Sequence, residues 1–530
     1  MIQGRGHGAL VAALTFFLVL LAGLHQLAVR YAGGSFTYPL DDTYIHLAMA
    51  KHFAQGQGWG ISADHFASSS SSPLWTLLLS AWMGVFGTGD EAPLLLATLF
   101  GLAAVVIAYR ALRQHATTPD LVWIALVLAI VSAPLATLSL SGLEHALQTA
   151  LALAFLAECA DQLSGAPTHM GNRMRLIALA FLLGGVRYES LLLVGCACLL
   201  FAVRGSLRFA IVLGLAAVAP VVAYGLWSMA HGWYFFPNSV LLKANIPSGA
   251  SADFTTETAF GALFRSPHLM VLMAGAGVLM ILADRAGRRW TWSQVALGMF
   301  LGAAVLHLGL ARIGWLFRYE AYLVFMGVVV IAIGLDDMRG RLWRPQGPLA
   351  WRALCLAALV LAVLPLAHRG VAALRKTPLA SKNIHDQQYQ MGTFLARYYP
   401  GAGVAANDVG AIAFLGEARI LDLFGLADLD VGRRKLSRTW DRQAIHDLAK
   451  ERGVKVAVVY DEWFARMGGV PREWMPAGEW TIARNVVCGS ARVAWYAVDP
   501  AESAPLMQHL RDFASRLPPD VAQDGPYRRP

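Results

Sequence analysis

Charged residues are scarce in this 530-residue chain, because Asp, Glu, Lys and Arg make up only 15% of it while hydrophobic residues make up 57%. Soluble globular domains carry roughly 25% charged residues, so the composition excludes an ordinary soluble protein. Apolar runs long enough to cross a bilayer, about 20 residues each, recur from Gly8 to about Arg369. The sequence therefore predicts a polytopic membrane protein.

Cysteine is sparse as well, with five residues in the whole chain. Cys159, Cys196, Cys198 and Cys355 lie in apolar runs, and only Cys488 belongs to the less apolar C-terminal part. This distribution excludes a disulfide framework, and the spacing matches no metal-binding motif.

A cleavable signal peptide is not indicated either. The first apolar run, near 10–29, follows a short basic start at Arg5, and it lacks a small-residue cleavage pattern followed by a polar mature domain. We therefore expect a retained first membrane helix. Arg and Lys in cytoplasmic loops explain the net charge of +9, so no nucleic-acid partner is predicted.

Run length predicts about twelve candidate spans, and crowding of short runs between 110 and 160 leaves the expected number at about 11–13. The Arg-rich connections at 285–289 and 339–352 are expected to face the cytoplasm, so the loops 30–72 and 229–267 are expected outside. The candidate spans lie near 9–29, 73–87, 92–109, 120–138, 141–158, 176–186, 189–203, 207–228, 268–284, 293–310, 315–335 and 350–367.

The composition becomes mixed after Arg369. Residues 1–369 are therefore predicted to form a transmembrane domain, and 370–530 an extracytoplasmic soluble α/β domain of ordinary size. The expected fold class is a polytopic α-helical membrane protein with a C-terminal α/β domain.

The C-terminal region alternates strand-like and helix-like runs, which indicates a small α/β layer. Asp408, Asp422 and Asp428 fall at strand ends or turns and are expected to be turn and capping residues. The last residues, 518–530, are polar and Pro-rich and are expected to be frayed. The strand-like runs are 403–408, 418–423, 454–460 and 492–498.

Two adjacent carboxylates, Asp41 and Asp42, open the stretch DDTYIHLAMAKHFAQGQGWG after the first apolar run. The spacing of its apolar residues predicts an amphipathic helix over about 43–55, lying on the outer membrane face. One carboxylate is expected to be its N-cap. The other, kept ionised by the helix dipole, is a candidate general base. His46 lies one turn after Asp42, where it would face the same cleft or be a plain interfacial histidine.

A serine run, SSSSSPLWT, precedes the second span. Ser72 followed by Pro73 is a typical helix start, with Ser as N-cap and Pro at the first helical position. The hydroxyls, those of Ser71 and Ser72 included, are candidates for binding a sugar or a phosphate. The alternative is a flexible linker.

Glu144 stands at the start of an apolar run, and Arg187 and Glu189 interrupt apolar sequence, where a charge is costly unless it serves a function. For Arg187 and Glu189, a hairpin tip in the headgroup zone is the plain alternative. The outer loops add Lys243 and Arg318, each of which alone would be an ordinary interfacial anchor. Together with Arg187 these cations lie on the same predicted side as the Asp pair, which is the pattern expected to hold a lipid-linked phosphate.

These motifs resemble those of the GT-C superfamily of integral-membrane glycosyltransferases. The acidic stretch and the Ser-Pro-Leu-Trp-Thr run are followed by SGLE, VRYES, FPNSVLLK and FRYEAYL, and the whole is most similar to the arabinofuranosyltransferase-like branch of bacterial cell-envelope assembly. The segment NDVGAIAFLGEARILDLFGLAD resembles the extracytoplasmic domain attached to such enzymes. Where relatives often carry Arg-Pro-Glu-Gly, this chain has Arg187-Tyr-Glu-Ser, a change to the hairpin's shape and not to its charges.

The resemblance implies an inverting transfer of a sugar from a polyprenyl-phosphate donor to a glycan, lipid or protein acceptor, on the outer side of the plasma membrane. Asp41 or Asp42 would be the base, and Arg187, Lys243 and Arg318 would bind the donor phosphate. The expected substrate-binding residues are His46, Ser71, Ser72, Glu144, Glu189, Asn238 and Tyr319.

Arabinofuranose is the sugar favoured by the resemblance, and a hexose such as mannose is the alternative. No cofactor is required, although a divalent metal near the Asp pair is compatible with the chemistry. A lipid or solute transporter with an accessory domain is an alternative of another class, but its typical inverted repeats are not found in the sequence. A purely structural membrane scaffold would leave the Asp pair and the cations unexplained.

Overall fold

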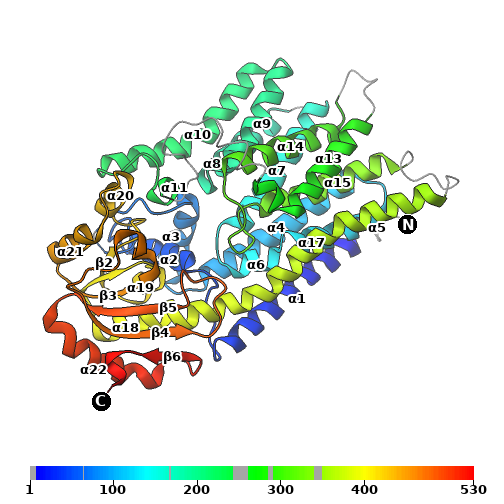
Figure 1. Ribbon diagram of the computed structural model, residues 1–530. Helices are drawn as coiled ribbons and strands as arrows, with labels where there is room; N and C mark the ends of the chain where they lie inside the picture. Colours follow the sequence, from blue (N-terminus) through cyan, green and yellow to red (C-terminus); the bar gives the residue numbers. More distant parts are fainter. Residues whose placement is uncertain are drawn as a thin grey trace. The chain divides into compact units, whose positions relative to one another are not determined.

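The computed structural model describes residues 7–63, 65–165, 169–242, 261–283, 290–339 and 349–529 (Figure 1). The chain divides into two compact units, each built from three segments. The helical unit comprises Met1–Leu24, Leu94–Tyr224 and Asn245–Arg375. The mixed unit comprises His25–Pro93, Gly225–Ala244 and Lys376–Pro530. The domain boundary expected after residue 369 stays a prediction.

Each predicted apolar run corresponds to a helix. Outside the mixed unit's α3 (Pro73–Phe86), these helices lie wholly or mostly in the helical unit. They are α1 (His7–Tyr31), α4 (Ala92–His115), α5 (Pro119–Ser132), α7 (His145–Ser164), α8 (Met170–Val186), α9 (Ser190–Val203), α10 (Leu207–Ala230), α13 (Pro267–Leu282), α14 (Trp292–Leu310), α15 (Ala321–Asp337) and α17 (Leu349–Ile384), with the short α6 (Leu135–Leu140) between α5 and α7.

Local sequence explains where several of these helices begin. Proline stands in the first turn of α3, α5 and α13, where its missing N–H has no helical partner to lose and its fixed φ suits the helix. Helix α14 begins with a capping box, in which Thr291 and Gln294 each accept a backbone N–H from the other.

Five helices among the described residues are long and apolar enough to cross a membrane: α1, α4, α10, α14 and a continuous segment from Leu356 to Tyr398 that includes most of α17. Four shorter apolar helices, α3, α5, α9 and α13, add to them. The chain is a multi-pass α-helical membrane protein, and the expected 11–13 spans stay a prediction.

Helix α15 lies at the centre of the helical unit. It packs against α5, α7, α13 and α14, and its residues from Ala321 to Val330 are all buried. Helix α7 in turn contacts α8, α9 and α14. An apolar helix buried on every side is typical of the middle of a bundle.

The mixed unit contains a six-stranded sheet in the order β2-β1-β3-β5-β4-β6. Strands β1, β2 and β3 are parallel, and the remaining pairs are antiparallel. The strands are β1 (Gly403–Ala406), β2 (Arg419–Asp422), β3 (Val454–Val459), β4 (Met475–Ile482), β5 (Arg492–Ala497) and β6 (Val521–Asp524).

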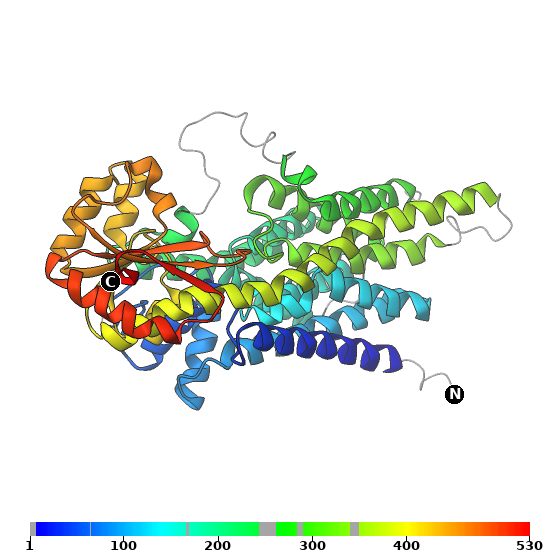
Figure 2. The ribbon, with the colours of Figure 1, turned by 60° about the horizontal axis from the view of Figure 1, so that its bottom comes forward.

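Helices cover both faces of this sheet, as the gold segments above it and the red and yellow segments below it show in Figure 2. On one face, Ile445 and Leu448 of α21 (Arg442–Glu451) pack on Ala457 and neighbouring sheet residues. On the other, Phe394 of α18 (Gln390–Tyr398) and Phe513 of α22 (Ser503–Phe513) pack around the sheet indoles of Trp480 and Trp495, which meet edge to face. The predicted α/β layer is confirmed.

The C-terminal end differs from the expected frayed segment. Residues 521–524 form β6, which pairs with β4, and Tyr527 is only 1% exposed. A Cβ added to Gly478 would lie 2.2 Å from the nearest atom of the Tyr527 ring, so this ring packs directly against the glycine. The polar composition of residues 518–530 concealed this one aromatic anchor.

Candidate active site

The Asp pair lies in the first turn of helix α2 (Asp41–Ala54), which matches the predicted helix. Its N-cap is Leu40, whose side chain makes no capping hydrogen bond, so the expectation that Asp41 or Asp42 caps this helix is wrong. The helix is buried over most of its surface, against α3 and against the six-residue α19 (Gly410–Leu415). It is therefore a packed helix of the mixed unit rather than a surface helix with one apolar face.

Asp41 holds the start of a different helix. Its Oδ2 accepts the backbone N–H of Gly410 at 2.7 Å, and its Oδ1 accepts that of Ala411 at 2.8 Å. We call this pair of bonds the amide clasp. A Cβ on Gly410 would lie 2.2 Å from the backbone oxygen of Asp41, so only glycine permits this approach. The two residues are 369 positions apart.

The protonation of Asp41 is set by its surroundings. Burial and the nearby charge of Asp408 raise the pKa of Asp41 to about 8, although the two N–H donors act in the opposite direction. Asp41 therefore changes charge near neutral pH, unlike an ordinary aspartate.

Asp408 and its neighbours anchor the segment before α19. The Oδ2 of Asp408 accepts the Tyr460 hydroxyl at 2.7 Å and the Gln388 side-chain amide at 2.9 Å. Asn407 accepts the backbone N–H of Tyr460 at 2.9 Å. Asp408 is therefore part of a side-chain network and is not a simple turn residue, whereas Asp428 caps α20 (Leu429–Leu436) as predicted.

Gln388 lies in a single π-helical turn, His385–Tyr389, between α17 and α18. Such turns occur frequently at functional sites because they redirect side chains. Here the turn directs Gln387 and Gln388 to the Tyr460 hydroxyl, at 2.9 and 2.8 Å, and Cys488 bonds to Gln388 at 3.3 Å.

Other predicted substrate-binding residues of the mixed unit are buried or half-buried. His46 is buried, with Nδ1 2.8 Å from the hydroxyl of Thr76. The serine run is ordered rather than a flexible linker: Ser72 is buried at the start of α3, and Ser71 is half-buried beside it.

Asn238 begins the short helix α11 (Asn238–Leu241) and is 1% exposed. Its side-chain N–H donates to the carbonyl of Gly425 at 2.8 Å, and its backbone N–H donates to the carbonyl of Ser68 at 2.9 Å. Asn238 therefore joins three segments of the mixed unit. Lys243 lies outside the described residues.

Arg187, Glu144 and Glu189 come together in the helical unit. Arg187 forms a two-fold bond with Glu189, at 2.7 and 3.1 Å, and a third bond with Glu144 at 2.5 Å. Glu144 is 1% exposed and Arg187 8%. The cation predicted to bind phosphate is therefore already paired with two carboxylates.

Tyr319 links the two predicted arginines of this unit. The guanidinium carbon of Arg187 lies 5.5 Å from its ring centre and that of Arg318 lies 5.0 Å from it, both within cation–π range. Arg318 is buried. Arg187, Arg318 and Tyr319 thus form one cluster, and their binding of a donor phosphate stays a prediction.

Sequence reasoning missed the neighbouring group of Glu320, Arg369 and His268. Glu320 lies 3.1 Å from Arg369 and 3.3 Å from His268, and it accepts the backbone N–H of Gly314 at 2.7 Å. The repeat of Arg-Tyr-Glu at 187–189 and 318–320 was the signal that could have identified Glu320.

The loop before Glu320 is strained. Trp315, Leu316 and Phe317 are three successive non-glycine residues with positive φ, at 43°, 54° and 61°. Arg369 donates to the carbonyl of Phe317 at 2.7 Å and so helps to hold this conformation.

The two groups of predicted residues belong to different units. Asp41, Asp42, His46, Ser71, Ser72 and Asn238 lie in the mixed unit, and Arg187, Glu144, Glu189, Arg318 and Tyr319 lie in the helical unit. That they share one cleft stays a prediction. Within the described residues, no group of three or more His, Cys, Asp or Glu side chains is arranged to hold a metal ion.

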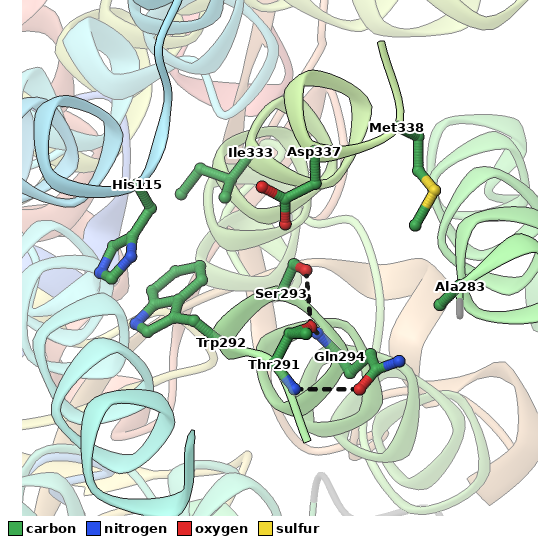
Figure 3. A pocket seen from close by; sticks show the side chains of 9 residues that line it. All are labelled: His115, Ala283, Thr291, Trp292, Ser293, Gln294, Ile333, Asp337 and Met338. Atoms are coloured by element: carbon green, nitrogen blue, oxygen red, sulfur yellow. Dashed lines mark hydrogen bonds between the residues drawn. The ribbon is translucent and has the colours of Figure 1, made fainter. Parts of the chain in front are cut away.

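A cavity of about 410 Å³ lies within the helical unit, at the ends of α4, α13, α14 and α15. Figure 3 shows the carboxylate of Asp337 and the hydroxyl of Ser293 directed toward its centre, with His115 beside Trp292. His115 stacks on Trp292 at 4.2 Å and pairs with Asp161 at 3.3 Å. None of the predicted site residues lines this cavity, so it is not the predicted active site.

Comparison with known proteins identifies the fold. Residues 382–498 match a domain of unknown function, DUF8728, and no curated protein matches the sequence. The structure is similar to the crystal structure of ArnT from Cupriavidus metallidurans bound to undecaprenyl phosphate, with a TM-score of 0.57 and 12% identity over 93% of this chain and 99% of that chain. The apo state of ArnT gives 0.55 and 13% over 92% and 99%.

The arabinofuranosyltransferase AftD from Mycobacteria gives a TM-score of 0.46 and 16% identity, over 91% of this chain and 40% of that chain. The likeness to ArnT extends along nearly the whole of both chains and shows a shared fold. The predicted fold class, a polytopic α-helical membrane protein with a C-terminal α/β region, is confirmed.

Proposed function

We propose that this chain is a glycosyltransferase that moves a sugar from a polyprenyl-phosphate donor to a hydroxyl group of an envelope glycan, lipid or protein. The fold shared with ArnT, whose crystal structure contains undecaprenyl phosphate, supports this proposal. The observation that carries it is the carboxylate pair Asp41 and Asp42 in the first turn of α2. Like charges placed side by side near a helix start are typical of a site for proton transfer.

The proposed reaction is a single displacement. The acceptor oxygen forms a bond to the anomeric carbon while the bond from that carbon to the donor phosphate oxygen breaks. A carboxylate of the Asp pair takes the acceptor's proton, and polyprenyl phosphate leaves with the bonding electrons. The configuration at the anomeric carbon inverts. Proton removal by a positioned base is typically worth about 10²–10⁴-fold in rate.

The leaving phosphate needs cations. Arg187, Arg318 and Lys243 stay the proposed phosphate ligands, and Arg369 is added to them. The Nε and Nη1 atoms of Arg369 are buried and find no acceptor within the described part of the chain, so phosphate oxygens would satisfy them. Loss of one such donor to a developing anion costs about 10²–10³-fold in kcat.

The site is proposed to lie on the outer side of the plasma membrane, with the C-terminal region extracytoplasmic, because the Arg-rich connections are expected inside. Arabinofuranose is the proposed sugar and a mannose-type hexose the alternative, both from the motifs. A hydroxyl of a glycan, a lipid or a protein serves equally well as acceptor in this chemistry.

The test is transfer by the purified full chain in lipid nanodiscs, supplied with a panel of polyprenyl-phosphate sugars and a mixed hydroxyl acceptor. Release of polyprenyl phosphate is followed for each donor. We expect one sugar to be consumed, and we expect the double variant Asp41→Asn/Asp42→Asn to abolish its consumption. The matched control is Asp120→Asn, an exposed aspartate in the first turn of α5. Full activity of the double variant would exclude the Asp pair as the base.

A further inference from the structure

Fixed backbone donors hold the carboxylate of Asp41, and this bears on which aspartate of the pair acts as the base. Both carboxylate oxygens of Asp41 accept backbone N–H groups, at 2.7 and 2.8 Å. Lone pairs directed at fixed amide donors are poorly placed to receive the proton of a substrate hydroxyl. Position is the first requirement for a base and its pKa the second. A pKa of about 8 therefore does not by itself make Asp41 the base.

The amide clasp requires close contact between Gly410 and Asp41. A Cβ on Gly410 would also lie 2.9 Å from the Cγ of Asp41. Next to the clasp, the rings of Tyr44 and Phe414 lie 6.0 Å apart, which packs the following turns of α2 and α19 together. The clasp is thus one end of a continuous helix contact.

A set of hydrogen bonds around Tyr460, which we call the Tyr460 network, holds the other side of the clasp. Tyr460 and Gln388 fix the carboxylate of Asp408, two residues before Gly410, and Asn407 is tied to the backbone of Tyr460. The segment Asn407–Ala411 is therefore anchored to Tyr460, which directly follows β3, and to Gln388 of the π-helical turn.

Resting on the proposed function, we propose that the segment Asn407–Ala411 positions the carboxylate pair, with Asp41 as a positioning residue and Asp42 as the base. Successive helical residues point about 100° apart, so fixing Asp41 fixes the direction in which Asp42 leaves the helix. In this proposal the C-terminal region contributes residues that hold the active site in place and does not merely cover it.

The test compares three variants, one at the proposed base, one at the amide clasp and one in the Tyr460 network. Asp42→Asn removes the base, Gly410→Ala forces α19 away from Asp41, and Tyr460→Phe removes only the hydroxyl that holds Asp408. The glycine control is Gly298→Ala in α14, where a Cβ meets no atom within 4 Å. Each variant is measured for kcat, for KM of donor and acceptor, for melting temperature, and for amide hydrogen exchange of the peptide 408–415.

We expect Asp42→Asn to lose about 10²–10⁴-fold in kcat. Gly410→Ala and Tyr460→Phe should lose about 10–100-fold in kcat at unchanged donor KM, because a displacement of about 1 Å in an active site costs up to about 10²-fold. Exchange of the peptide 408–415 should accelerate in both. A purely structural role would lower the melting temperature and leave kcat per folded molecule unchanged, which would overturn the proposal.

Two further outcomes would also overturn it. One is an active Asp42→Asn beside an inactive Asp41→Asn, because Asp41 would then be the base. The other is equal exchange of the peptide 408–415 in the parent chain and in Asp41→Ala, because the clasp would then be absent. If the parent chain consumes no donor at all, the proposed function fails, and the exchange result still decides whether the clasp exists.

Discussion

The two units stabilise buried carboxylates in opposite ways. In the helical unit, Glu144 and Glu189 share an ion pair with the guanidinium of Arg187. In the mixed unit, Asp41 is held by two neutral amide groups. An ion pair cancels charge, whereas an amide donor orients a carboxylate and leaves its charge in place.

The difference has a functional consequence. A carboxylate paired with arginine is a permanent part of the scaffold, because removing either charge leaves the other unpaired in a buried site. A carboxylate held by amides keeps the freedom to gain or lose a proton. Asp41 illustrates this freedom, since burial and the charge of Asp408 raise its pKa to about 8. Each of the following experiments would break or sharpen this comparison.

The largest effect is expected from Arg187→Ala. It leaves Glu144 and Glu189 without their cation, and breaking a buried pair in this way lowers the free energy of unfolding by about 3–5 kcal/mol. The measurement is thermal unfolding of the purified protein in nanodiscs. Arg187→Lys, which keeps the charge without the two-fold fork, should lose less. An unchanged melting temperature in Arg187→Ala would contradict the claim that these ion pairs stabilise the helical unit.

The second effect is a pH dependence of stability that belongs to Asp41. Its pKa is raised from 3.8 to about 8, so the folded protein retains a proton that the unfolded chain releases. Stability from this group is complete below about pH 4 and is lost as the pH rises through about 8. Melting temperatures of the parent chain and of Asp41→Asn, recorded from pH 4 to pH 9, measure it. The variant should show the flatter profile, and parallel profiles would contradict the assignment.

A smaller effect is expected at Asn238, where the mixed unit again relies on amide contact. A Cβ on Gly432 would lie 2.5 Å from the Asn238 side-chain nitrogen, so Gly432→Ala should lower the free energy of unfolding by about 1–3 kcal/mol. Chemical denaturation followed by tryptophan fluorescence is the measurement. Gly298→Ala, in open space, should stay within experimental error of the parent chain.

The smallest effect is expected from Asp428→Ala. Asp428 caps its own helix by accepting the N–H groups of Asp430 and Val431, at 3.0 and 3.1 Å. Losing a local cap costs about 1 kcal/mol. Hydrogen exchange should accelerate in α20 alone and leave peptide 408–415 unchanged. Faster exchange in both regions would show that the cap of α20 and the amide clasp are coupled.

Much of the fold could be predicted from the sequence because its signals are local. Every apolar run became a helix, and β1, β2, β3 and β5 were predicted from short runs bounded by turn residues. Strand β4 was missed because Pro476 and Gly478 interrupt it, and the structure shows a register shift between them. Strand β6 was missed because its four residues gain their place through pairing with β4.

The candidate site was only partly predictable. The Asp pair and the Arg-Tyr-Glu segments stand out because charge is rare in apolar sequence. The partners of these charges come from far along the chain, as the contacts of Glu320 with Arg369 and of Asp41 with Gly410 show. Sequence spacing carries no information about such pairs, so the amide clasp and the second arginine group required the structure.

The separation of Asp41 from its amide donors also sets an order of events during synthesis. The ribosome must add 369 residues after Asp41 before Gly410 exists. At about 5–20 residues per second this takes roughly 20–70 seconds. Throughout that interval helix α2 has been made without the helix that completes its packing. A chaperone or protease that recognises exposed apolar surface would bind this early segment. Chains whose synthesis stops before residue 410 would keep that surface exposed.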